Sequence, residues 1–256
     1  TTALAVLPAG TGNVLAAQLG QVGVPTPLHR PQPGDAARGL AAGRVHAVDV
    51  GLATPRGRPP RYFLLMAGVG LDARITRAVE QDKDLKKAIG PAAFGALGLK
   101  TLVDVSGTRA LVHYRHQRLK DNLILAVVSN IRLYAGSVEL SPDARVNDGM
   151  LDLEVFWGQG PMEFLGHLGG ILTGRHNGEP TRHSARVQWV RFITREPLPV
   201  QLDGDTYGET PVTIRVHPGG LRLLVPPGAP EALFASAADT PSDAEADNLA
   251  APLSAD

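Results

Sequence analysis

The stretch Asn122–Ser129 reads NLILAVVS, an apolar run with a polar residue at each end. Its apolar part, Leu123–Val128, is far shorter than the roughly 20 residues that a membrane-spanning helix needs. Its length and its branched aliphatic residues favour a β-strand. The run therefore predicts a strand in a soluble or peripheral protein.

Strand-like runs recur on both sides of this stretch. They are separated by short segments rich in residues that favour turns. Nine ranges show the pattern: Val45–Ala53, Arg61–Ala67, Arg109–Arg115, Asn122–Ser129, Leu151–Trp157, Ala185–Thr194, Pro199–Leu202, Val212–Val216 and Leu221–Val225. About nine short strands are typical of a β-sandwich or barrel, so we predict a β-sandwich-like domain.

Three helical patterns interrupt the predicted strands. They span Ala73–Lys87, Ala92–Val105 and Met162–Leu172. Asp72 is placed to cap the first helix, and Pro161 suits the first turn of the last one, because proline is tolerated there. We interpret all three as crossover helices that pack on the sheets.

The chain before residue 45 has a different pattern. Leu4–Leu7 predicts a short strand, Pro8–Asn13 a loop and Val14–Leu19 a helix. Four prolines between residues 25 and 34 end this helix. The order strand, loop, helix is typical of an α/β unit.

A second short helix completes the N-terminal unit. Asp35 can cap it, and it ends at Gly43, which can supply the left-handed residue that often follows a last turn. The last residues are rich in Ala, Asp, Ser and Pro, a composition that cannot offset the entropy of ordering. We predict an α+β chain with three parts: a partial α/β domain at 1–44, a β-rich domain at 45–228 and a mostly disordered tail at 229–256.

Composition and charge exclude several kinds of protein. The 25 basic and 25 acidic residues create no net positive field that would gather nucleic acid. The absence of cysteine excludes disulfides, thiolate zinc sites and a cysteine nucleophile, and it fits the cytoplasm. Neither GxSxG nor HExxH occurs, so hydrolase and metalloprotease functions lack an anchoring residue.

The loop Leu7–Asn13 reads LPAGTGN and lies between the predicted strand and helix. Its glycines permit the close approach of a phosphate, and free amides at a helix start attract anions. The hydroxyl of Thr11 can add a donor. The spacing matches neither GxxxxGK[ST] nor GxGxxG, so an ordinary connection remains an alternative from the residues alone.

A longer stretch around this loop resembles a known family. Pro8–Gly20, PAGTGNVLAAQLG, is similar to the second nucleotide-loop motif of diacylglycerol kinases, sphingosine kinases and bacterial lipid kinases. Three later stretches resemble further motifs of that family, in the family's order: Phe63–Ala73 (FLLMAGVGLDA), Ser141–Asp152 (SPDARVNDGMLD) and Val200–Asp205 (VQLDGD). The resemblance extends over about residues 4–226.

The resemblance implies ATP-dependent phosphorylation of a lipid hydroxyl, on a diacylglycerol-like or sphingoid substrate. It makes residues 1–44 part of an ATP-binding domain, with Gly10, Thr11, Gly12 and Asn13 at the nucleotide. It also implies Mg²⁺, a role in phospholipid biosynthesis and a peripheral position at the cytoplasmic face of the inner membrane. A homodimer is left open.

The segment Asn147–Gly149 is a polar turn between two apolar segments, and from its pattern alone it is equally well a hairpin turn. The resemblance adds a second interpretation, because the matching turn of the family holds a structural Mg²⁺. The ligands would be the side chain of Asp148 and the backbone carbonyls of Arg145 and Met150, and hard oxygen ligands suit Mg²⁺.

The segment Asp203–Asp205 reads DGD and, from its pattern alone, is most simply a turn. In the similar kinases this motif reads DGE, and its glutamate is the general base that takes the proton from the lipid hydroxyl. Asp205 holds that position here. Aspartate retracts the carboxylate by on the order of 1 Å, and a misplacement of that size can cost roughly a hundredfold in rate.

One part of the family's nucleotide site is not found. The first nucleotide motif, GGDGT, should lie before Gly10, but it occurs nowhere in the 256 residues. The chain also opens on an apolar segment without an initiator methionine, which we interpret as the start of a fragment. We therefore expect this chain alone to bind ATP poorly and to be inactive. Two alternatives are a non-catalytic lipid-binding or regulatory fragment and an NAD-kinase-like enzyme.

Three other features have simpler structural explanations. His113 and His116 fall on opposite faces of a predicted strand, which disfavours a metal pair. The basic segment Arg175–Arg186 is more simply a solvated loop than a lipid-binding one. The apolar helix surface at Phe94–Val103 is more simply buried than bound to a membrane.

Overall fold

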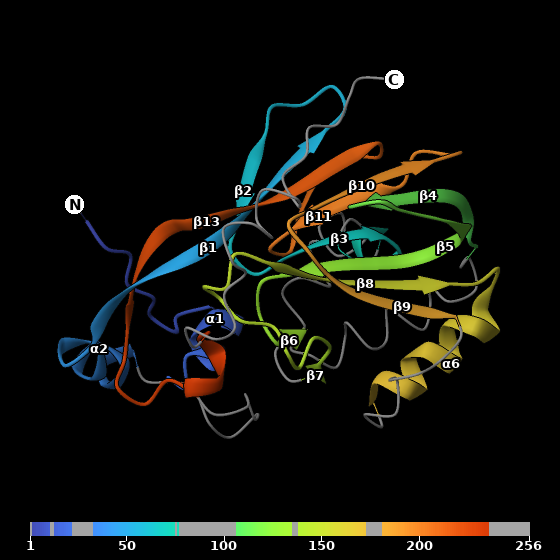
Figure 1. The fold of residues 1–256 in the computed structure, drawn as a ribbon. Coiled ribbons are helices and arrows are strands. Elements are labelled where there is room, and N and C mark those ends of the chain that lie inside the picture. Colours follow the sequence, from blue (N-terminus) through green and yellow to red (C-terminus); the bar gives the residue numbers. More distant parts are fainter. Residues whose placement is uncertain are drawn as a thin grey trace.

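The computed structural model describes residues 2–10, 13–21, 33–74, 76, 106–134, 138–172 and 181–235. Helices α1 (Val14–Gln18) and α2 (Pro33–Ala41) lie at one end of the molecule. Helix α6 (Pro161–Leu172) lies at the other end, and a strongly curved β-sheet occupies the space above and between them (Figure 1).

In the described part of the chain, eleven strands form the main sheet and two short strands form a separate ribbon. Their bounds are β1 (Arg44–Pro55), β2 (Arg61–Phe63), β3 (Met66–Gly70), β4 (Thr108–Tyr114), β5 (Gln117–Ser129), β6 (Leu133–Tyr134), β7 (Val138–Glu139), β8 (Leu151–Trp157), β9 (Arg182–Val187), β10 (Trp189–Thr194), β11 (Pro199–Leu202), β12 (Asp205–Glu209) and β13 (Val212–Val225). The main order is β12-β11-β3-β5-β4-β10-β13-β1-β2, with β8 paired to β5 and β9 to β8.

Strand β5 is the centre of the sheet because it has three neighbours. Its first half pairs with β4, and its second half lies between β3 and β8. Every residue from Leu123 to Ser129 is buried, which explains why this part of the strand is a continuous apolar run rather than an alternating one. The change of partners midway along β5 accompanies the curl of the sheet.

The longest pairing joins β1 to β13, and a register shift beside Asp49 forms a bulge in it. Bulges commonly re-aim a side chain. The buried carboxylate of Asp49 accepts hydrogen bonds from the backbone N–H groups of Gly149 and Gly219, at 2.7 and 2.8 Å. Asp49 therefore fastens the Asn147–Gly149 turn to the β1–β13 ribbon.

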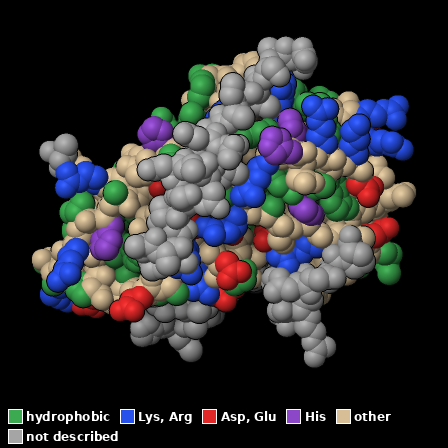
Figure 2. Space-filling view, viewed as in Figure 1, with side chains coloured by type: hydrophobic (Ala, Val, Ile, Leu, Met, Phe, Trp, Pro, Cys, Tyr) green, Lys and Arg blue, Asp and Glu red, His purple; other side chains and the backbone are tan. Residues whose placement is uncertain are grey.

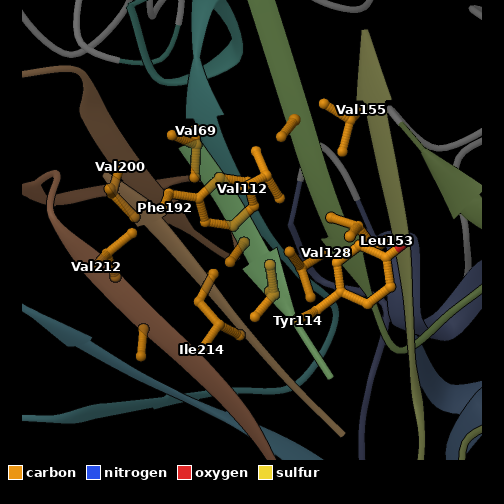
Figure 3. Close-up of a cluster of buried hydrophobic side chains, with 14 of the residues drawn as sticks. Val69, Val112, Tyr114, Val128, Leu153, Val155, Phe192, Val200, Val212 and Ile214 are labelled. Atoms are coloured by element: carbon orange, nitrogen blue, oxygen red, sulfur yellow. The ribbon is translucent and has the colours of Figure 1, made fainter. Parts of the chain in front are cut away.

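Two clusters of buried side chains stabilise the fold. The first fills the inside of the curled sheet and includes Val112, Tyr114 and Phe192 (Figure 3). The second lies on the other face of β3 and β5 and includes Leu19, next to α1, and Leu233. The segment after α1 and the end of the described chain therefore share one core with the sheet.

The predicted α+β class, dominated by strands, is confirmed, and the differences are local. The range Ala185–Thr194 contains two strands, β9 and β10, which are separated at Gln188. The ranges Val212–Val216 and Leu221–Val225 are parts of one strand, β13. Strand β12 was not predicted because its sequence, DTYGE, has almost no apolar residues.

The predicted strand at Leu4–Leu7 is wrong. Only Leu4 pairs with the sheet, through an isolated bridge to Leu223 of β13. The side chains of Leu4 and Leu7 are 41% and 48% exposed, so this apolar run does not contribute a buried strand face. The helix predicted next to it is confirmed as α1.

The ends of helix α2 also differ from the prediction. The helix begins at Pro33, so Asp35 lies in its first turn and does not cap it. Gly43 is not in the left-handed conformation. It is needed for space, because a Cβ there would lie 2.7 Å from the carbonyl oxygen of Val225 and 2.9 Å from that of Leu40.

The structure bears on the three predicted crossover helices to different extents. Helix α6 begins at Pro161, as predicted. Residues 71–74 are helical, so Asp72 lies inside a helical turn rather than before it, and most of Ala73–Lys87 lies outside the described residues. The predicted helix Ala92–Val105 also lies outside them.

The first residues of the predicted tail are ordered. They include a 3₁₀ turn, η2 (Glu231–Leu233), whose Leu233 is fully buried. The N–H of Val146 donates to the carbonyl of Leu233 at 3.0 Å, and the N–H of Ala235 donates to Oδ1 of Asn147 at 2.7 Å. This segment therefore packs under the Asn147–Gly149 turn, and residues 236–256 lie outside the described part.

Candidate functional site

The DGD turn joins β11 to β12 and is anchored by its first aspartate. Asp203 has a φ of 53°. Its carboxylate accepts three backbone hydrogen bonds, from Leu64 at 2.7 Å, Leu65 at 2.8 Å and Met66 at 3.0 Å. These donors belong to the corner between β2 and β3. Asp203 thus holds the turn in place.

Asp205, at the other end of the same turn, is accessible to solvent. Its side chain is 66% exposed, and its carboxylate accepts a hydrogen bond from Nη2 of Arg61 at 2.9 Å. The Arg61 guanidinium also lies over the ring of Tyr207, 5.1 Å from the centroid. An exposed ion pair contributes only about 0–1 kcal/mol, so this pair orients Asp205 and can open at little cost.

Asp72, in the helical turn after β3, is the centre of a hydrogen-bond network. Its carboxylate accepts hydrogen bonds from the hydroxyl of Tyr134 and from Nε2 of Gln201, the latter at 2.6 Å. Oε1 of Gln201 accepts the N–H of Gly204 at 2.7 Å. Burial raises the pKa of the Asp72 carboxyl, while these two donors act in the opposite direction. The network connects the end of β3 to the DGD turn.

Gly68 makes room for this carboxylate. It is paired with Gln201 between β3 and β11. A Cβ on Gly68 would lie 1.9 Å from Oδ2 of Asp72 and 2.8 Å from Nε2 of Gln201. The motif MAGVG therefore contains glycine here because the Asp72 carboxylate lies directly over the backbone of β3.

The glycine-rich loop is attached to the same network through α1. Oε1 of the buried Gln18 accepts the backbone N–H groups of Arg132 at 3.2 Å and Leu133 at 3.0 Å. The next residue, Tyr134, donates to Asp72. A continuous path of hydrogen bonds and one short chain segment thus runs from α1 to the DGD turn.

The described part of the predicted nucleotide loop is closed by Asn13. Oδ1 of Asn13 accepts the N–H of Gly10 at 2.9 Å, and its Nδ2 donates to the Gly10 carbonyl at 2.7 Å. Thr11 and Gly12 lie outside the described residues. Asn13 therefore ties its own position to that of Gly10, and the contact of Gly10, Thr11, Gly12 and Asn13 with a nucleotide stays a prediction.

Asp148 lies in the Asn147–Gly149 turn and is only 1% exposed. Its Oδ1 accepts the N–H of Met150 at 2.9 Å, and its Oδ2 contacts Nη2 of Arg186 on β9. Burial raises the pKa of Asp148, and Arg186 opposes this shift. The guanidinium of Arg186 therefore compensates part of the cost of burying this charge.

The predicted magnesium ligands fit the ion in kind, but Arg186 competes for one of them. Carboxylate and carbonyl oxygens are the ligands that Mg²⁺ prefers. Both oxygens of Asp148 already accept hydrogen bonds, and across the described ranges no group of three or more acidic or histidine side chains is arranged to hold a metal. A Mg²⁺ ion at Asp148, Arg145 and Met150 stays a prediction, and it would share the Asp148 carboxylate with Arg186, whose side chain is 41% exposed, or displace it.

Strand β8 carries two further buried acids beside this turn. Burial raises the pKa of Asp152 to about 7, with Arg186 lowering it and Asp148 raising it. Glu154 is bound by Arg182 at 2.7 Å and by the hydroxyl of Ser184 at 2.5 Å. The negative charges of Asp152 and Glu154 are therefore compensated mainly by the arginine side chains of β9.

The structure groups the predicted residues into two networks. The turn that carries Asp205 is connected to the glycine-rich segment, whereas Asp148 belongs with Asp49 and Arg186. Asp72 was predicted only as a helix cap, and Gln201 was not among the predicted site residues. Both residues lie inside motifs that carry the family resemblance, FLLMAGVGLDA and VQLDGD. Their place in these motifs is the sequence signal that could have identified them.

Comparisons with known proteins agree with these motifs. The family model described as the YegS C-terminal NAD kinase beta sandwich-like domain matches residues 66–225. A "Probable lipid kinase YegS-like" from Pseudomonas aeruginosa (strain UCBPP-PA14) is 31% identical over 227 residues, which cover 89% of this chain and 69% of that protein. A "Probable lipid kinase YegS" from Salmonella arizonae is 29% identical over 229 residues, covering 89% and 70%.

The fold also matches solved structures. A crystal structure from Bacillus anthracis str. Sterne, provisionally named a diacylglycerol kinase, superposes with a TM-score of 0.68. The match has 24% sequence identity and covers 89% of this chain and 70% of that chain, a level at which the likeness concerns the fold. With the family model matching more than half of the residues, this chain belongs to the YegS-like family of bacterial lipid kinases.

Proposed function

We propose that this protein takes part in the transfer of the γ-phosphate of ATP to the hydroxyl of a diacylglycerol-like or sphingoid lipid. The hydrogen-bonded path from α1 to the DGD turn carries the proposal. Phosphoryl transfer depends on holding the nucleotide and the acceptor in one fixed geometry. The path supports this because it connects the predicted nucleotide loop to the predicted base. The names of the relatives support a lipid acceptor.

In this proposal each of the predicted residues has one task. The loop residues Gly10, Thr11, Gly12 and Asn13 bind the nucleotide. Asp205 takes the proton from the lipid hydroxyl while that oxygen attacks the γ-phosphorus atom, and the bond from this phosphorus to the bridging oxygen breaks to release ADP. The accessible carboxylate of Asp205 suits this role, and the weak pair with Arg61 must open when the hydroxyl arrives.

Two positions for Mg²⁺ belong to the proposal. The ion that is bound with ATP would neutralise phosphate charge. A second, structural ion would be held by Asp148 and by the carbonyl groups of Arg145 and Met150. Its task would be to stabilise the turn, which the structure already ties to β1 through Asp49.

We place the reaction at the cytoplasmic face of the inner membrane, where a lipid acceptor is found. No helix among the residues that the structure describes has both the length and the apolar character to cross a bilayer. Contact with the membrane would therefore be peripheral for the described part of the chain.

Label transfer from ATP to extracted lipid tests the function, using the protein encoded by the complete reading frame. Asp205→Asn should lower the rate by about a hundredfold to ten-thousandfold, because it removes the base. Its melting temperature should stay close to that of the wild type, since the exposed pair with Arg61 contributes little. Asp35→Asn, which changes another exposed carboxylate, on α2, is the control and should keep full activity.

Two outcomes would replace the proposal. Binding of lipid without any label transfer would favour a non-catalytic lipid-binding or regulatory protein. Transfer of label to NAD rather than to lipid would favour an NAD-kinase-like enzyme, an alternative that the NAD kinase beta sandwich-like description of the family keeps in view. Full activity of Asp205→Asn would exclude Asp205 as the base.

A further inference from the structure

The outer surface of β4, β5 and β10 is rich in basic side chains. Side chains alternate along these strands, so Val112 and Phe192 enter the core while their neighbours stay outside. We call the following six residues, on this surface or at its edge, the basic face: Arg109, Arg118, Lys120, Arg191, Arg195 and Arg215. Lys and Arg side chains gather near the ends of β4 and β10 in Figure 2.

The strand register brings like charges together on this face. His113 is paired with Arg118 on β5 and with Arg191 on β10. Directly opposed residues lie close enough to interact, and like charges in such positions are destabilising. The pKa of His113 is lowered by its partial burial and, in addition, by Arg118 and Arg191. The positive charges of Arg118 and Arg191 therefore disfavour protonation of the His113 imidazole.

Among the residues that the structure describes, no acidic side chain is ion-paired with the basic face. None of its six cations forms an ion pair with a described residue, whereas Arg61, Arg182 and Arg186 each bind a carboxylate. The whole chain has equal numbers of basic and acidic residues. The positive charge of this face therefore results from the placement of residues and not from composition.

Apolar side chains and a hollow lie among these cations. Ile193 is 37% exposed and is paired with the half-buried Leu111. A hollow of about 450 Å³ at this place is lined by both residues, by the three cations Arg109, Lys120 and Arg195, and by a single acid, Asp121. Cations that meet phosphate groups, together with apolar side chains that enter the headgroup boundary, are the combination that favours an anionic bilayer surface.

We propose that the basic face docks this protein onto a bilayer that contains anionic phospholipids. The choice of partner rests on the proposed function, because a lipid acceptor lies in a bilayer. Charge complementarity supports it, because the unpaired cations gain phosphate partners and their mutual repulsion falls. The exposed Ile193 favours this partner over a nucleic acid, whose backbone offers only charge.

Vesicle co-sedimentation of the full chain tests the proposal, with phosphatidylcholine vesicles that contain or lack phosphatidic acid. Neither lipid has a free alcohol, so binding is measured independently of phosphorylation. Each basic side chain near an anionic surface strengthens association about fivefold, so Arg118→Gln/Lys120→Gln should weaken binding about 25-fold. The matched control is Arg44→Gln/Arg56→Gln, which removes two exposed arginines outside the basic face and should bind as the wild type does.

Salt gives a second measurement that needs no variant. Screening should reduce binding of the wild type strongly between about 0.05 and about 0.5 M salt. Equal binding to vesicles with and without phosphatidic acid, or equal loss in both double variants, would overturn the proposal. The proposal would also be overturned if the protein bound DNA more tightly than vesicles and the Arg118→Gln/Lys120→Gln variant lost this DNA binding. If binding to anionic vesicles depends on the basic face but the protein transfers no label, membrane docking is supported and only the kinase function is rejected.

Discussion

Gly68→Ala should destabilise the protein and, if the proposed function is correct, inactivate it. A Cβ at this position would lie 1.9 Å from Oδ2 of Asp72 and 2.8 Å from Nε2 of Gln201. Either the carboxylate leaves its two donors or strand β3 shifts. Overpacking costs about 1–3 kcal/mol, and a lost hydrogen bond to a charged group costs about 1.5–3 kcal/mol. We expect the free energy of unfolding to fall by about 2–4 kcal/mol.

Thermal unfolding followed by circular dichroism measures this effect. In a domain of this size each kcal/mol shifts the Tm by about 2–4 °C, so Gly68→Ala should lower the Tm by about 5–15 °C. Gly166→Ala is the matched control, because Gly166 lies in α6 and a Cβ there would meet no atom within 4 Å. The control should be neutral or stabilise the helix by up to about 1 kcal/mol.

A double-mutant cycle separates the contact with Asp72 from other effects of the methyl group. Asp72→Ala removes the oxygen that the new Cβ would meet. In that background Gly68→Ala should cost at least about 1 kcal/mol less than it does in the wild type. Additive costs of the two changes, or an unchanged Tm of Gly68→Ala, would refute the explanation of this glycine.

Two further predictions concern the buried carboxylates. Arg186→Gln removes the cation beside Asp148, and should cost on the order of 1–3 kcal/mol without Mg²⁺, less than a fully buried pair. If the predicted ion binds there, Mg²⁺ should raise the Tm of this variant more than that of the wild type, and equal shifts against a chelator control would contradict the site. Asp72→Asn should flatten the dependence of stability on pH. Burial raises the pKa of Asp72 above 3.8 in the folded state, which then holds the proton more tightly than the unfolded state. Wild-type stability should therefore fall as the pH rises through that pKa, and urea unfolding at about pH 4 and about pH 7 should show a smaller fall in the variant.

The fold was largely predictable because its strands are marked locally. The continuous apolar run at Leu123–Val128 and the alternation at Arg109–Arg115 each record how many faces of the strand are buried. The sequence does not record which strands are neighbours. Leu4–Leu7 shows the consequence, since an apolar run of strand length forms only one bridge and stays partly exposed.

The candidate site was predictable only where its residues belong to one turn. The DGD and Asn147–Gly149 turns are short motifs and were found. The contact between Gln201 and Asp72 joins residues 129 positions apart, and that between Arg61 and Asp205 joins residues 144 positions apart. The first contact exists because β11 lies beside β3, and the second joins β12 to β2, which stand at opposite ends of the strand order. Both relations follow from the whole sheet and from no local pattern.

The rigidity of the DGD turn decides how the protein accommodates aspartate at the position of the base. Three backbone hydrogen bonds hold Asp203, and Gln201 holds the N–H of Gly204. Aspartate is shorter than glutamate by on the order of 1 Å. The backbone of this turn is therefore not free to move forward and make up for that difference. If Asp205 is the base, Asp205→Glu should restore the reach and raise the rate of label transfer, by up to about a hundredfold. A lower rate in Asp205→Glu than in the wild type, with an unchanged Tm, would show that the acceptor is bound closer to this turn and that aspartate is the fitted length.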